Sequence, residues 1–156
     1  DADTIQGNAM IKANCITKRF GMNCFADDTG LEVEALDGAP GVYSARFAGE
    51  HATFEDNVAL LLERLKGVPA PRRACFRTVI ALIDEYGTHF FEGAVNGEIT
   101  LEHSGDHGFG YDPVFRPEGC QQTFAELSSE EKNAMSHRGR AVQRLARYLH
   151  ALPLDE

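Results

Sequence analysis

The chain has 156 residues, of which 43% are hydrophobic and 25% are charged, and its formal net charge is -9. This size and composition are typical of one globular domain with a buried core. The acidic balance argues against nucleic acid as a partner, because a phosphate backbone is bound by basic surfaces. No apolar run approaches the roughly 20 residues that a membrane helix needs. Neither a membrane partner nor a signal peptide is therefore expected.

The four cysteines contain no C-x-x-C pair, so the sequence shows neither a zinc site nor a redox motif. Cys15, Cys24 and Cys75 lie in apolar-patterned segments and are expected to be small core residues. A reducing cytoplasm is the expected location for such a chain.

The first predicted element is a helix over residues 5–20. Its apolar residues recur at spacings of three and four, and Gly21 follows as a stop signal. Residues 22–26 predict a short buried strand that ends at the polar run D-D-T-G over 27–30. Apolar and acidic residues alternate over 31–36, which predicts a second, half-buried strand.

A second helix is predicted to begin after Thr53 and to end at Gly67. Its expected core stripe is Phe54, Val58, Leu61, Leu62 and Leu65. Residues 74–83 are an apolar run rich in strand formers, and Asn96-Gly97 is a two-residue hairpin signal between residues 89–95 and 98–101.

The C-terminal part is predicted to be helical. Residues 128–131 have the S-x-x-E form of a capping box. The last helix has the expected core stripe Val142, Leu145, Leu149 and Leu152. Helices and strands are mixed without regular alternation, which predicts an α/β protein built on a twisted, partly antiparallel sheet.

Three constellations could carry chemistry. The first is Asp27-Asp28, whose side chains point to opposite faces of a strand, so that at most one faces a given site. A carboxylate at a strand end suits Mg²⁺, which takes one or two protein oxygens and keeps waters and phosphate oxygens. A solvated acidic turn is the alternative, and the dipeptide alone favours that turn.

The second constellation is the glycine-rich run over residues 105–112, in which Phe109 and Tyr111 alternate with glycines. It is not a P-loop or a dinucleotide fingerprint. Its aromatic faces could stack on a base, and a packed loop with core aromatics is an equal alternative. The third is Lys132, His137 and Arg138, which could contact phosphate or a carbonyl, or could belong to a solvated helix face.

Taken together, these segments resemble the inosine triphosphatase family, the Ham1-type nucleotide pyrophosphatases. The resemblance rests on seven sequence words that occur in the family's order across nearly the whole chain. These words are N-A-M-I-K-A (8–13), A-D-D-T-G-L (26–31), G-A-P-G-V-Y-S-A-R (38–46), F-G-Y-D-P (109–113), T-F-A-E-L (123–127), E-K-N (131–133) and S-H-R-G-R-A (136–141).

The resemblance implies an ITPase-like (Maf/Ham1) α/β fold, with a long twisted mixed sheet flanked by helices in two lobes. It also implies Mg²⁺-dependent hydrolysis of non-standard purine nucleoside triphosphates (ITP, dITP, XTP) to the monophosphate and pyrophosphate. Asp28 is implied as the general base and a Mg²⁺ ligand. The implied substrate-binding residues are Lys12, Thr29, Phe109, Gly110, Tyr111, Asp112, Lys132, His137 and Arg138.

Several expectations accompany this resemblance. Family members normally begin with a strand and a T-N-N-x-x-K loop, so the chain is expected to be a single domain lacking that strand, that loop and a glutamate metal ligand. Asp1 or Asp3 is the expected substitute for this ligand. A cytoplasmic homodimer is expected, with a small nucleotide as substrate. Two alternatives stay open: a nucleotide-binding protein without turnover, and a related pyrophosphatase for modified pyrimidine nucleotides.

Overall fold

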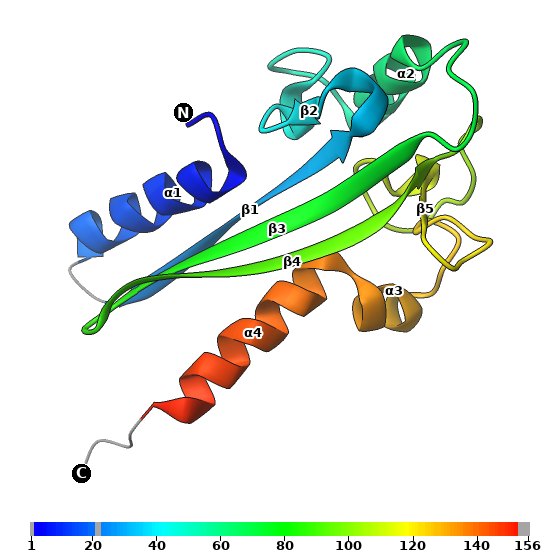
Figure 1. Ribbon diagram of the computed structural model, residues 1–156. Coiled ribbons are helices and arrows are strands. Elements are labelled where there is room, and N and C mark those ends of the chain that lie inside the picture. The colour runs from blue at the N-terminus through cyan, green and yellow to red at the C-terminus, as the bar shows by residue number, and fades with distance from the viewer. Residues whose placement is uncertain (1, 21–22, 153–156) are drawn as a thin grey trace.

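The computed structural model describes residues 2–20 and 23–152 (Figure 1). Its helices are α1 (Ile5–Phe20), α2 (Phe54–Arg64), α3 (Ser129–Met135) and α4 (His137–Ala151). Its strands are β1 (Cys24–Val33), β2 (Pro40–Gly41), β3 (Arg73–Asp84), β4 (Gly87–Ile99) and β5 (Phe115–Pro117). The strands form one sheet in the order β2-β1-β3-β4-β5. Within the described residues, three short 3-10 helices, Glu34–Leu36, Ser44–Arg46 and Asp112–Val114, lie in the connections.

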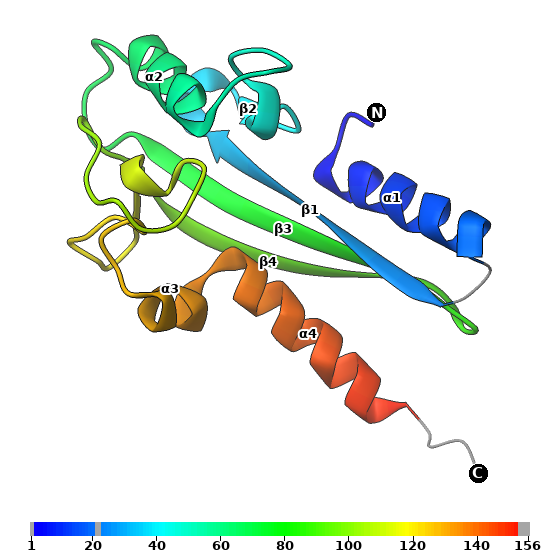
Figure 2. The ribbon, with the colours of Figure 1, turned by 180° about the vertical axis from the view of Figure 1, so that it is seen from behind.

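Two helices cover opposite faces of the long strands β1, β3 and β4, as both views show (Figures 1 and 2). The α1 stripe Ile5, Ala9 and Ala13 packs against Val79 and Ala81 of β3. On the other face, Ala141 and Leu145 of α4 pack against Ile80 and Leu82. Because neighbouring residues of a strand point to opposite faces, β3 supplies both layers with alternate side chains.

The largest group of buried side chains lies where α2, β5 and the connecting loops meet the sheet. Phe115 and Phe124 are fully buried there, and the ring centroids of Phe76 and Phe115 are 4.6 Å apart. Leu31 and Leu61 belong to the same cluster. Each such side chain contributes roughly 1.5–3 kcal/mol through burial, so this cluster holds the loops of the site against the sheet.

The α/β class and both flanking helices are confirmed. The expected interruption at residues 27–30, between a strand over 22–26 and a second strand over 31–36, is wrong. β1 runs without interruption through the acidic pair, with Asp27 opposite Ile80 and Asp28 opposite Val79 of β3. The continuous ladder with β3 keeps residues 27–30 extended, so the solvated-turn alternative fails. Residues 34–36, expected as strand, form a 3-10 helix. Met22 lies outside the described residues.

The expected hairpin at Asn96-Gly97 is also wrong. Both residues lie inside β4, where Gly97 pairs with Ala74 of β3 on one side and with Pro117 of β5 on the other. Strand partners on both sides leave no room for a turn. The hairpin instead lies at residues 85–86, between the paired residues Asp84 and Gly87. All the pairings recorded within the described residues are antiparallel, where a mixed sheet was expected.

Three details of the expected core differ from the structure. Cys15 is exposed, because it lies off the α1 stripe, and Cys24 and Cys75 are only partly buried. Phe54 is 53% exposed at the start of α2. On α4, the buried residues are His137, Ala141 and Leu145, whereas Val142 and Leu149 are about half exposed. Leu145 of the expected stripe therefore does contact the sheet, whereas the rest of the contact runs through His137 and Ala141.

Candidate functional site

Lys12 and Asp28 form an ion pair between α1 and β1. Lys12 Nζ donates to Asp28 Oδ1 at 2.8 Å and to the Asp27 carbonyl at 3.0 Å. The Asp28 side chain is 17% exposed and the Lys12 side chain is 53% exposed. A cation beside a partly solvated carboxylate is suited to anionic substrates, because it lowers local negative charge while leaving the carboxylate accessible to water.

Asp27 lies on the other face of the sheet, beside α4. Arg138 donates to Asp27 Oδ2 at 2.5 Å and to Thr29 Oγ1 at 3.3 Å. Thr29 Oγ1 also lies 2.8 Å from Oγ1 of the buried Thr78. Strand alternation therefore places Asp28 with Lys12 on one face, and Asp27 and Thr29 with Arg138 on the other, as the sequence predicted for the two carboxylates.

The start of α4 is fixed by Ser136. Its hydroxyl accepts from the Gly139 backbone N–H at 3.0 Å, which caps the helix and places His137 and Arg138 in the first turn. The predicted capping box is confirmed one helix earlier. There Ser128 and Glu131 exchange side-chain and backbone hydrogen bonds and so define the α3 turn that carries Lys132.

His137 is buried and stacks on Phe76, with ring centroids 4.7 Å apart and planes inclined by 13°. Burial, followed by the positive charges of Lys132 and Arg138, lowers its pKa to about 4, so the ring is neutral at physiological pH. Its Nδ1 is buried and has no hydrogen-bond partner among the described residues. An unpaired buried N–H donor is costly, so we assign the proton to Nε2.

Lys132, Asp112 and Phe109 are joined in one cluster. Lys132 Nζ donates to Asp112 Oδ2 at 2.6 Å and lies 4.4 Å from the centroid of the Phe109 ring. Phe109 is 60% exposed, and the ring of Phe54 approaches its ring at 6.3 Å between centroids. Sequence reasoning missed Phe54, because its place in the apolar stripe of α2 indicated a core residue.

The structure separates the two aromatic residues of the glycine-rich run. Tyr111 is 5% exposed, and its hydroxyl donates to the Ser44 carbonyl at 2.6 Å. Tyr111 is therefore a core residue, as the packed-loop alternative of the sequence analysis has it. Gly110, between Phe109 and Tyr111, has φ of 61°, a conformation that favours glycine.

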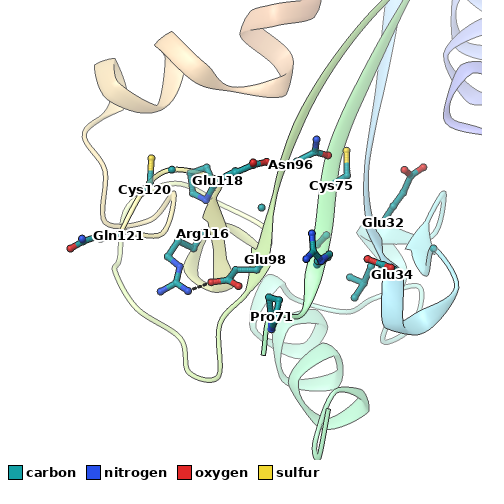
Figure 3. Close-up of a pocket in the computed structure, with 17 residues that line it drawn as sticks. Glu32, Glu34, Pro71, Cys75, Asn96, Glu98, Arg116, Glu118, Cys120 and Gln121 are labelled. Atoms are coloured by element: carbon teal, nitrogen blue, oxygen red, sulfur yellow. Dashed lines mark ion pairs between the residues drawn. The ribbon is translucent and has the colours of Figure 1, made fainter. Parts of the chain in front are cut away.

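A cavity of about 720 Å³ opens elsewhere, beside β3, β4 and β5 (Figure 3). Arg116 and Glu98 form an ion pair there, and Cys75 and Asn96 extend from the neighbouring strands. The described lining of this cavity includes none of the ten predicted site residues. The polar clusters around β1 and α4, rather than this cavity, are the candidate site.

The donor set around Asp28 fits a Mg²⁺ ion held chiefly by phosphate and water. Across residues 2–20 and 23–152, no three His, Cys, Asp or Glu side chains form a metal-holding cluster. Mg²⁺ does not require one, because it commonly takes one or two carboxylates and completes its octahedron with water and substrate oxygens. Asp3 is exposed and lines a separate cavity of about 590 Å³. Asp1 lies outside the described residues.

No helix in the described part of the chain is long and apolar enough to cross a membrane. The model of the Ham1 family matches residues 1–148. A protein of Porphyromonas gingivalis named dITP/XTP pyrophosphatase is 62% identical over 148 residues, which cover 95% of this chain and 76% of that protein. A protein of Flavobacterium johnsoniae with the same name is 53% identical over 150 residues, which cover 96% of this chain and 78% of that protein.

Solved structures agree with the sequence comparison. A HAM1 protein from Coxiella burnetii matches with a TM-score of 0.92 at 42% identity, covering 97% of this chain and 79% of that chain. The Ham1 protein of Staphylococcus aureus matches with a TM-score of 0.91 at 42% identity, covering 96% and 78% of the two chains. The chain belongs to the Ham1 family.

Proposed function

We propose that this protein hydrolyses non-standard purine nucleoside triphosphates, such as dITP, XTP and ITP, to the monophosphate and pyrophosphate. The observation that carries the proposal is the Lys12–Asp28 pair between α1 and β1, in a chain 62% identical over 148 residues to a protein named dITP/XTP pyrophosphatase. The phosphate anhydride bond resists hydrolysis because its negative charge repels a nucleophile. A carboxylate that accepts a proton, beside a cation, addresses both difficulties.

In the proposed reaction, Asp28 accepts a proton from a water molecule as the water oxygen forms a bond to phosphorus. The α–β anhydride bond breaks, and pyrophosphate leaves. Lys12 and Lys132 bind phosphate oxygens and offset their charge. Mg²⁺, when bound at Asp28, supplies further charge neutralisation and lowers the pKa of a bound water. The carboxylate remains partly exposed beside Lys12, which supports a role with water and a cation.

The same proposal accounts for the choice of base. Arg138 has only donors, so it pairs with the O6 acceptor of hypoxanthine or xanthine and cannot accept from the amino group of adenine. Asp27 and Thr29 hold its guanidinium in place. The neutral His137, with its proton on Nε2, adds a second donor. Phe109, a residue that is 60% exposed, supplies a stacking face with its ring.

Pyrophosphate release with Mg²⁺ tests the proposal on a panel of ITP, dITP, XTP, ATP, GTP, dUTP and a methylated pyrimidine nucleotide. We expect release from ITP, dITP and XTP, little release from ATP, and loss of release in D28N. Binding of ITP without release by the wild-type protein would favour a nucleotide-binding role. A preference for dUTP or the methylated pyrimidine would favour the pyrimidine alternative.

The proposal also covers the oligomeric state, the cellular location and the domain organisation of the enzyme. We infer a homodimer in the cytoplasm, and the four free cysteines are compatible with a reducing compartment. This chain is proposed to form a single ITPase-like domain. β2 pairs with β1 only at Leu31 and Glu32, and this supports the expectation of a further strand beside the rest of that edge.

A further inference from the structure

Asp112 is a buried carboxylate that serves two partners with one oxygen. The residue is 3% exposed, and its side chain is 4% exposed. Oδ2 accepts from Lys132 Nζ at 2.6 Å and from the Phe109 backbone N–H at 3.0 Å. A carboxylate buried to this degree needs such partners, because an unpaired charge in the interior is costly. A side chain with so little accessible surface is badly placed to touch a nucleotide.

The Lys132 ammonium is held at a defined position by this carboxylate. Its side chain is 15% exposed, and Nζ lies 4.4 Å from the Phe109 ring centroid and 5.8 Å from that of Phe124. A lysine stem is flexible and loses considerable rotamer freedom when it is ordered. Asp112 therefore maintains the position of the ammonium before any substrate arrives.

The same Asp112 oxygen also holds the backbone of Phe109, whose ring is exposed. Gly108 has φ of 76°, and a Cβ at this position would overlap the Asp112 carboxylate. The absence of a side chain lets the loop close onto Oδ2, which then accepts from the next backbone N–H, that of Phe109. One carboxylate oxygen thereby sets the spacing between an exposed ring and an ammonium group.

We infer that Asp112 is a positioning residue, not a direct substrate contact: it fixes Lys132 relative to Phe109, so that one nucleotide meets both. This inference rests on the proposed function, and it refines the expected role of Asp112. Asp112 influences phosphate binding by positioning Lys132, and it influences base stacking by positioning Phe109.

A double-mutant cycle with D112N and K132M tests this role. Asparagine keeps an acceptor for the Phe109 N–H but loses the charge that holds Lys132. We expect D112N to raise KM for ITP about tenfold while kcat changes little, since a charge-assisted hydrogen bond is lost from a binding group. In the K132M background, D112N should add almost nothing to KM. Additive effects on KM, or a loss of kcat at unchanged KM, would overturn the inference.

Two further variants complete the design. E98Q removes the acid of the Arg116–Glu98 pair beside the 720 Å³ cavity, and should leave KM unchanged. If D112N does not fold, G108A takes its place, because it displaces the carboxylate without removing a charge. G108A must raise KM with kcat retained, and an unchanged KM overturns the inference. If wild-type protein releases no pyrophosphate, the proposed function fails, and the same cycle measured as ITP affinity by equilibrium dialysis decides the role of Asp112.

Discussion

Asp27 and Asp28 are neighbours in β1 whose carboxylates bind cations on opposite faces of the sheet. Asp28 accepts from Lys12 of α1, and Asp27 accepts from Arg138 of α4. Two adjacent residues of one strand therefore form ion pairs with both helices that flank the sheet. The two acids have the same chemistry and nearly the same position, so the partner of each decides its role.

Substitution of these acids should separate turnover from binding. D28N removes the proposed general base, so kcat for pyrophosphate release from ITP should fall by roughly 10²- to 10⁴-fold. D27N leaves the base in place but frees Arg138, so KM should rise several-fold while kcat is largely retained. Steady-state kinetics with Mg²⁺ measure both parameters.

Glu32 provides the matched control for this pair. It also lies on β1, where it pairs with Arg77 rather than with a residue of the candidate site. E32Q should leave kcat and KM close to those of wild type. Equal losses of kcat in D27N and D28N would contradict the division of roles between the two faces.

The aromatic residues of the glycine-rich run should respond differently to substitution. F109A removes an exposed stacking face, so KM for ITP should rise roughly 5- to 150-fold, in line with about 1–3 kcal/mol for a stacked base. Y111F removes the buried hydroxyl that donates to the Ser44 carbonyl, so the free energy of unfolding should fall by about 1 kcal/mol while KM stays near wild type. Kinetics and urea unfolding on both variants check this contrast, and a larger KM change in Y111F would refute it.

Much of the fold was predictable because it depends on local periodicity. The α1 stripe follows from the spacing of Ile5, Ala9 and Ala13, and the opposite orientation of Asp27 and Asp28 follows from strand alternation. The wrong predictions concern segments whose conformation is set by strand partners distant in sequence. Asn96-Gly97 has the local chemistry of a turn, yet β3 and β5 pair on either side and keep it extended.

In the candidate site, too, local sequence identified residues but not their distant contacts. Lys132 and Arg138 were identifiable as residues, but their carboxylate partners Asp112 and Asp27 come from segments 20 and 111 residues away. Which of Phe109 and Tyr111 faces solvent depends on Ser44, which lies 67 residues from Tyr111. No pattern of neighbouring residues encodes such a contact, since it depends on how the loops pack over the sheet.

Gly93 is a point where α4 lies directly on β4. A Cβ there would overlap the His137 carbonyl oxygen and lie 2.5 Å from the Ala141 backbone nitrogen. G93A should therefore push the helix away, lower the free energy of unfolding by about 1–3 kcal/mol, and raise KM for ITP because His137 and Arg138 move with the helix. The control is A94S, since this side chain points to the other face of the strand. Thermal melts and kinetics that do not distinguish G93A from A94S would contradict the close packing.

The neutral imidazole of His137 should make stability depend on pH. Burial lowers its pKa from 6.5 to about 4, so between these values the unfolded chain binds a proton that the folded chain does not. The free energy of unfolding is therefore highest above pH 6.5, as far as His137 determines it. It falls by a total of about 3 kcal/mol as the pH falls to 4. Urea unfolding at about pH 7.5, 5.5 and 4.5 measures the loss. H137N should flatten this part of the curve, whereas H51N, at an exposed histidine, should leave it unchanged. Parallel curves for wild type and H137N would show that the buried ring is not the source.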